Sequence, residues 1–142
     1  MNSSPLIFFL IPKLPSADMK GVGGGELSNM MLISSIAKKF NVIVLPMLFS
    51  SNNYTFDKHI KVIKPHYKLS GRIGYFLEKY VFYYRRLYKL ASKHRPDKII
   101  STRSTVFSAY TLKSIFKCEL EVIVRAYEDF TNRKKFDPYS KV

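Results

Sequence analysis

Apolar positions along this chain form two kinds of pattern, which alternate from the N-terminus onward. Leu6–Ile11 is apolar at every position, as is typical of a parallel strand covered on both faces. Further short runs rich in β-branched residues predict strands at residues 41–45, 59–63, 97–101 and 121–125.

Three segments between these strands have apolar residues at helical spacing. One covers residues 27–40, and a short one near the C-terminus covers Val106–Phe116. Between these two lies one long helix at residues 71–94, which ends before Pro96. The face of this long helix expected to be buried consists of Ile73, Leu77, Tyr80, Tyr84, Leu87 and Ala91.

This order of elements, with short connections, predicts an α/β fold: a Rossmann-like, doubly wound parallel sheet in a single domain. The 142 residues are 46% hydrophobic, which suits one domain with a substantial core. We expect the domain to cover residues 1–125 and residues 126–142 to form a polar tail or interdomain segment.

The expected cellular location follows from the apolar segments, the N-terminal residues and the cysteine content. The apolar run Leu6–Ile11 is far shorter than the roughly 20 residues of a membrane span, and the N-terminus lacks the basic side chains of a signal peptide. Cys118 is the single cysteine, so no intrachain disulfide forms, and we expect its thiol to be buried as a small hydrophobic group. A reducing cytoplasm is the expected location.

A glycine-rich segment, residues 21–26, lies between the first strand and its helix, where open α/β sheets bind ligands. It is either a plain loop or a cradle whose backbone N–H groups approach a phosphate. Glu26 stands where a dinucleotide fingerprint needs glycine, and no Gly-Lys-Ser/Thr ending follows. These differences disfavour a nicotinamide cofactor and an ATPase.

Other polar residues predict little chemistry. The three histidines, His59, His66 and His94, have no metal-ligand spacing, and no metal or other cofactor is expected. Glu128 and Asp129 are adjacent, so their side chains diverge in an extended segment, which disfavours a paired-carboxylate hydrolase.

The chain resembles the N-terminal domain of family-4 glycosyltransferases, which have the two-domain GT-B architecture. Three stretches match this domain in order and spacing: the glycines that open the first helix (23–26), the helix end with the second strand (36–45), and the Pro-Asp strand (95–101). The resemblance implies that Gly23, Gly24 and Gly25 approach the donor diphosphate, with Arg103 and Ser104 on the acceptor side. It also implies a catalytic role for Glu128.

Two departures from the family pattern change what the resemblance implies. The segment 125–129 has no histidine where the family usually has one that contacts the sugar. Family members also have a second domain that binds the nucleotide-sugar, and none follows Val142. We therefore expect a truncated or split enzyme that is inactive without a separate C-terminal glycosyltransferase half.

Positive charge is concentrated in one third of the chain. The net charge is +14, and 13 Lys or Arg side chains lie between Lys58 and Arg103 against two acidic ones. Aromatic residues alternate with cations along the long helix, which suits an anionic membrane surface. The membrane-facing cations would be Arg72, Lys79, Arg85, Arg86 and Lys89.

Two other interpretations of the long helix stay open. It can be a packed helix with a solvated outer face, or its cations can bind nucleic acid, although no helix-turn-helix, RNP or zinc-finger pattern supports nucleic acid. We predict a peripheral protein on the cytoplasmic face of the membrane that transfers sugar from a nucleotide-sugar to a polysaccharide or lipid-linked acceptor. The alternative is a non-catalytic adaptor module for acidic lipid or nucleic acid.

Overall fold

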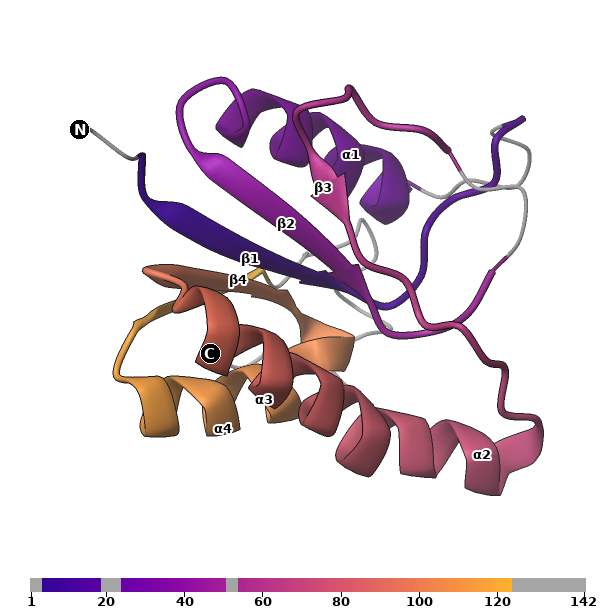
Figure 1. Ribbon diagram of the computed structural model, residues 1–142. Coiled ribbons are helices and arrows are strands. Elements are labelled where there is room, and N and C mark those ends of the chain that lie inside the picture. The colour runs from indigo at the N-terminus through magenta and orange to yellow at the C-terminus, as the bar shows by residue number, and fades with distance from the viewer. Residues whose placement is uncertain (1–3, 19–23, 51–53, 124–142) are drawn as a thin grey trace, which may run out of the picture.

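The structure is a computed structural model that describes residues 4–18, 24–50 and 54–123. It is an α/β domain with a five-stranded, all-parallel sheet flanked by helices, which confirms the predicted Rossmann-like fold class (Figure 1). In chain order the elements are β1 (Leu6–Ile11), α1 (Gly24–Ile36), β2 (Asn41–Pro46), β3 (Lys61–Val62), α2 (Gly71–Leu77), the π-helical turn η1 (Glu78–Phe82), α3 (Tyr83–His94), β4 (Lys98–Thr102), the 3₁₀ turn η2 (Arg103–Thr105), α4 (Val106–Phe116) and β5 (Glu119–Ile123).

The strand order, β3-β2-β1-β4-β5, places β1 at the centre. From β1 the chain builds outward through β2 and β3, and it then returns to the other side of β1 for β4. In the register of the sheet, Phe8 on β1 lies between Ile43 on β2 and Ile99 on β4. The loops after β1 and β4 therefore lead away in opposite directions, as at the ligand-binding crevice of open α/β sheets.

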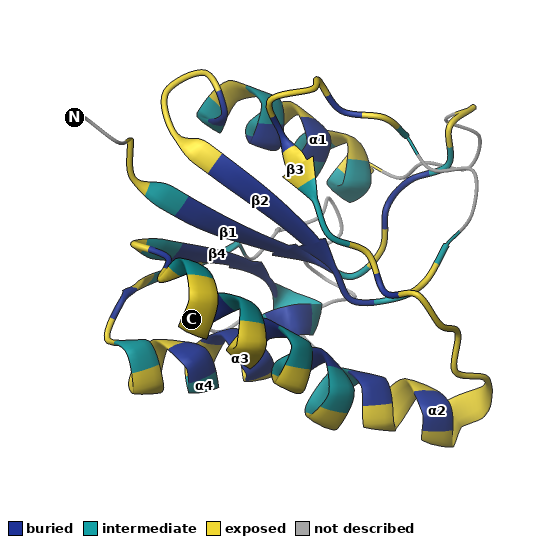
Figure 2. Cartoon of the chain, in the orientation of Figure 1, coloured by how far each residue is buried: buried dark blue, intermediate teal, exposed yellow. Residues whose placement is uncertain are grey.

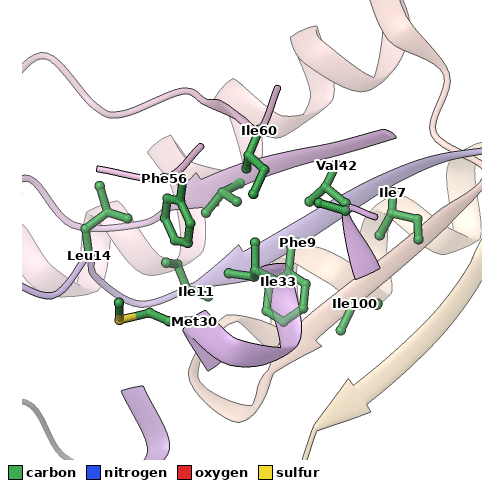
Figure 3. Packing of buried hydrophobic residues seen from close by; sticks show 12 residues of the cluster. Ile7, Phe9, Ile11, Leu14, Met30, Ile33, Val42, Phe56, Ile60 and Ile100 are labelled. Carbon is green, nitrogen blue, oxygen red and sulfur yellow. The ribbon is translucent and has the colours of Figure 1, made fainter. Parts of the chain in front are cut away.

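Alternate residues of β1 are buried on opposite faces of the sheet, as its unbroken apolar sequence predicts. Phe9 and Ile11 belong to the cluster under α1, which Figure 3 shows from close by. Phe8 and Leu10 belong to the cluster under α3 and α4, which also contains Cys118. Figure 2 shows the dark-blue buried strands between these helical layers, and the expected burial of Cys118 is confirmed.

Asp97, just before β4, joins the starts of the two central strands. Its Oδ2 accepts a hydrogen bond of 2.8 Å from the Leu6 N–H, and its own N–H donates to the Leu6 carbonyl at 2.8 Å. The aspartate of the Pro-Asp sequence thus fixes β1 against β4, which is a structural role.

The predicted long helix contains a π turn, and this turn changes which residues face the core. The buried positions are Gly74, Glu78, Tyr83, Leu87 and Ala91, separated by four, five, four and four residues. The step of five falls on η1, because a π turn advances the buried face by one extra residue. The prediction that Ile73 and Leu77 share the buried face is therefore wrong, since both are exposed.

The outer strands differ slightly from the predicted ranges. β3 is only two residues long: Lys61 and Val62 lie opposite Ile43 and Val44 of β2. β5 begins at Glu119, two residues earlier than predicted, and it pairs with β4 along its whole length. The predicted polar tail, residues 126–142, lies outside the described residues.

Lys117 ends α4 in the left-handed region, with φ of 54°. We expect Lys117→Gly to raise the free energy of unfolding by about 1 kcal/mol, because glycine has no Cβ to clash in this conformation. The exposed Lys113 within the same helix is the control: Lys113→Gly should lower it by about 1 kcal/mol. Urea unfolding followed by circular dichroism measures both changes, and a loss of stability in Lys117→Gly would contradict the expectation.

Candidate functional site

A cavity of about 880 Å³ lies at the carboxyl end of the sheet, where the chain leaves β1 in one direction and β4 in the other. Five segments contribute to it: the end of β1, the start of α1, the turn η1, the loop after β4 with α4, and the end of β5. The lining residues are Pro12, Gly25, Glu26, Asn29, Lys79, Tyr80, Thr102, Arg103, Ser104, Val106, Phe107, Tyr110, Thr111 and Ile123.

The first turn of α1 forms one wall of the cavity. Gly25 and Glu26 line it, and a Cβ added to Gly24 would meet no described atom within 4 Å. The unpaired N–H groups at a helix N-terminus favour an anion, and glycines leave room for it to approach. Gly23, predicted to act with Gly24 and Gly25, lies outside the described residues.

The loop after β4 forms the opposite wall and contains both predicted acceptor-side residues, Arg103 and Ser104. Buried hydroxyl groups fix the conformation of this loop. Thr105 Oγ1 is 2.7 Å from Ser101 Oγ and 3.1 Å from Thr102 Oγ1, and it donates to the Thr102 carbonyl at 3.1 Å. The structure thus brings Arg103 and Ser104 to the same cavity as Gly25.

Lys79 lies in the cavity, although the sequence analysis assigned it to a membrane-facing surface. The π turn η1 carries it there, and its ammonium group lies 5.4 Å from the centroid of the Tyr80 ring. Ser108 Oγ on α4 donates to the Lys79 carbonyl at 3.4 Å, so this turn contacts α4 directly.

Aromatic side chains form a third wall that the sequence analysis did not predict. The Tyr80 and Phe107 rings meet edge to face, with their centroids 4.9 Å apart, and both line the cavity. Phe76, outside the lining, packs against Tyr80 at 4.8 Å. No local signal in the sequence relates these residues, since Phe107 is on a different helix.

Arg86 also differs from its predicted role, because its guanidinium turns inward. Its Nη2 lies 3.2 Å from Glu78 Oε1 and donates to the Met47 carbonyl at 3.0 Å, and the group lies over the Tyr83 ring at 5.3 Å. A buried carboxylate at Glu78 needs a nearby cation, and Arg86 supplies it. Arg86 is therefore a structural residue, whereas Arg72, Arg85 and Lys89 are exposed.

Among the described residues, the two titratable groups whose pKa is clearly raised, Tyr83 and Cys118, lie outside the cavity lining. Burial raises the pKa of Tyr83 well above its ordinary range, and the Tyr83 hydroxyl donates to the Leu45 carbonyl. Burial likewise raises the pKa of the Cys118 thiol. Both groups belong to the packed layer between the sheet and α3 and α4.

Two features are absent from the described ranges, residues 4–18, 24–50 and 54–123. In these ranges no three His, Cys, Asp or Glu side chains come together as metal ligands would. No helix there has the length and apolar character that crossing a bilayer requires. Glu128, the predicted catalytic residue, lies outside the described residues.

The described lining has two cations, Lys79 and Arg103, and one carboxylate, Glu26. Together with the N-terminus of α1 they favour an anionic group, while the aromatic wall offers contact to an apolar group. Comparison with protein-family models gives no match for this chain, and comparison with curated proteins gives none either, so the functional assignment depends on this geometry and on the sequence motifs.

Proposed function

We propose that this domain is the acceptor-side half of a GT-B glycosyltransferase, which moves a sugar from a nucleotide-sugar to an acceptor. A donor-binding half, in the same polypeptide or as a separate subunit, would complete the active site. The observation that supports this most is the cavity at the crossover between β1 and β4, lined by Gly25 on one side and by Arg103 and Ser104 on the other.

The chemistry of sugar transfer suits these groups. When a nucleoside diphosphate departs from the sugar, negative charge develops on its phosphates, and fixed positive groups lower the barrier. Lys79, Arg103 and the N-terminal N–H groups of α1 are the candidates for that role in the described part of the chain. Glu26 can accept a hydrogen bond from a sugar hydroxyl, and Glu128 stays the proposed catalytic residue.

A second candidate function is binding to an anionic membrane surface without catalysis. The exposed cations Arg72, Arg85 and Lys89 favour it, because each cation near such a surface contributes about 1 kcal/mol. The same cations would hold a transferase at the cytoplasmic face of the membrane, so the two proposals are compatible. Nucleic acid is the weaker alternative partner.

Sugar transfer can be tested in an extract of cells that lack this gene, supplied with the purified full-length chain. We expect the chain to restore transfer of radiolabel from one member of a panel of nucleotide-sugars to acceptors in the extract. Arg103→Ala and Gly24→Phe should reduce transfer at least tenfold, since about 1.4 kcal/mol of lost transition-state stabilisation corresponds to this factor. A side chain added at position 24 projects into open space, so Gly24→Phe tests how closely the ligand approaches and has little effect on packing.

Lys38→Ala is the matched control, because Lys38 is exposed just beyond the opposite end of α1 and lies outside the cavity lining. It should transfer sugar like the unmodified chain. Transfer that is independent of the added chain, or equal in Arg103→Ala and Lys38→Ala, would overturn the proposal.

A further inference from the structure

One face of α2, continued by the turn η1, carries an apolar stripe that the described residues leave largely exposed. Ile73, Phe76, Leu77 and Tyr80 follow one another at helical spacing, so they lie on one side of the helix. Ile73 is 78% exposed, Phe76 59% and Leu77 37%. In Figure 1, α2 extends beyond the sheet, and Figure 2 shows it largely in the colour of exposed residues.

This stripe leads into the cavity. Phe76 contacts Tyr80, and Tyr80 contacts Phe107, with ring centroids 4.8 and 4.9 Å apart. We call these three rings the aromatic strip, and Ile73 with Leu77 the apolar tip of α2. The strip thus connects the apolar tip to the cavity that holds Lys79 and Arg103.

The geometry of the strip suits a flexible chain better than a flat ring. Successive ring planes are inclined by 48° and 75°, so the strip offers no continuous flat surface on which sugars or bases could stack. Phe76, Phe107 and the apolar tip also have no polar groups that could bond sugar hydroxyls. An alkyl or prenyl chain needs neither of these features, because it gains only from apolar contact.

The charges near the strip complement a phosphate. From residue 58 to residue 96 the described chain contains one carboxylate, Glu78, which is buried beside Arg86. Lys79 and Arg103 lie at the cavity end of the strip, against one carboxylate in the described lining, Glu26 on the first turn of α1. The exposed Arg72 lies beside the apolar tip. The cavity end therefore attracts an anionic headgroup, while the outer end suits contact with an anionic membrane.

We propose that the acceptor is an amphiphile with a phosphate headgroup and a long apolar chain. The headgroup enters the cavity between Lys79 and Arg103, the chain lies along the aromatic strip, and the apolar tip of α2 contacts the bilayer from which the acceptor comes. This inference rests on the proposed function and selects the lipid-linked acceptor over a water-soluble polysaccharide.

The test is calorimetric titration of the full-length chain with inorganic phosphate, butyl phosphate and decyl phosphate, the last below its micelle concentration. We expect decyl phosphate to bind at least tenfold more tightly than butyl phosphate, because its additional methylene groups are transferred from water to the apolar surface of the strip. Equal affinities for the two alkyl phosphates would overturn the proposal and indicate a water-soluble phosphate ligand.

Variants separate the headgroup site from the chain site. The double variant Phe76→Ser with Phe107→Ser should bind decyl phosphate no more tightly than butyl phosphate. The double variant Lys79→Gln with Arg103→Gln should bind both alkyl phosphates more weakly. Ile115→Ser is the control, because Ile115 is 47% exposed on α4 and outside the cavity lining. If Ile115→Ser reduced the chain-length dependence as much as the double serine variant, apolar binding would be unspecific and the proposal would fail.

Sedimentation with vesicles distinguishes a lipid headgroup from a free phosphate. We expect the chain to sediment with phosphatidic acid vesicles, to stay in solution with phosphatidylcholine vesicles, and to lose sedimentation in Ile73→Ser with Phe76→Ser. If the protein binds neither alkyl phosphate nor vesicles and instead self-associates through this stripe, a second copy of the chain covers the stripe. In that case the proposal is wrong. Sugar transfer without alkyl phosphate binding would reject this inference while retaining the proposed function.

Discussion

Replacing Arg86 with methionine is expected to lower the free energy of unfolding by about 3 kcal/mol. Methionine keeps the apolar stem of the side chain but removes the cation beside Glu78, whose side chain is only 4% exposed. A carboxylate left buried without its cation retains the full cost of its lost hydration. The Met47 carbonyl also loses the hydrogen bond that it accepts from Arg86.

The geometry of this ion pair predicts that its two members are coupled. Glu78 Oε2 and Arg86 Nε have no hydrogen-bond partner among the described residues, so the pair is held by one contact rather than two. Replacing both residues with methionine should therefore recover at least half of the loss caused by Arg86→Met alone.

Urea unfolding of the two single variants and the double variant measures this coupling. Arg85→Met is the control, because Arg85 is the exposed neighbour on the same helix and should change stability by less than about 0.5 kcal/mol. If Arg86→Met cost no more than Arg85→Met, the burial of Glu78 would not depend on Arg86.

Alkaline pH is expected to remove the stabilisation that Tyr83 contributes. At neutral pH, Tyr83→Phe should cost about 1–2 kcal/mol, because the buried Leu45 carbonyl loses its donor. Burial raises the pKa of Tyr83, so above about pH 10 the unfolded chain releases this proton while the folded protein retains it. Stability then falls with rising pH, by up to about 1.4 kcal/mol per pH unit from this group.

The comparison between the unmodified protein and Tyr83→Phe isolates this group, because every other titratable group is present in both proteins. The stability advantage of the unmodified protein should shrink between pH 9 and pH 11 as the unfolded tyrosine ionises. Urea unfolding across this range measures it. Tyr88→Phe, which removes an exposed hydroxyl from the same helix, is the control and should change stability at neutral pH by less than about 0.5 kcal/mol. An advantage at Tyr83 that stays constant with pH would contradict the expectation.

The sequence was informative where a residue's role depends on its neighbours along the chain. The unbroken apolar run Leu6–Ile11 predicted a central strand covered on both faces, and the structure has it with the same bounds. The short helix Val106–Phe116 was also predicted with its observed bounds. Edge strand β3 was predicted too long, because its length depends on how far β2 offers it a partner.

Part of the lining of the candidate site was also named from the sequence. The glycine-rich segment was singled out because it follows the first strand of an open α/β sheet, and Arg103 was named from the family resemblance; the structure places Gly25 and Arg103 in one cavity. Lys79, Tyr80 and Phe107 were missed as lining residues, because their meeting depends on how the turn η1 packs against α4.

By itself the sequence determined the fold class, the central strand and the positive charge of the long helix, since hydrophobic periodicity and charge are properties of local residue order. Only the tertiary structure decided which face of that helix is buried. A π turn at Glu78–Phe82 shifts the buried face by one residue, so that Glu78 pairs with Arg86 while Ile73 and Phe76 face outward. A carboxylate lies in this core only because an arginine two helical turns later reaches it, and no pattern of hydrophobic spacing records that contact.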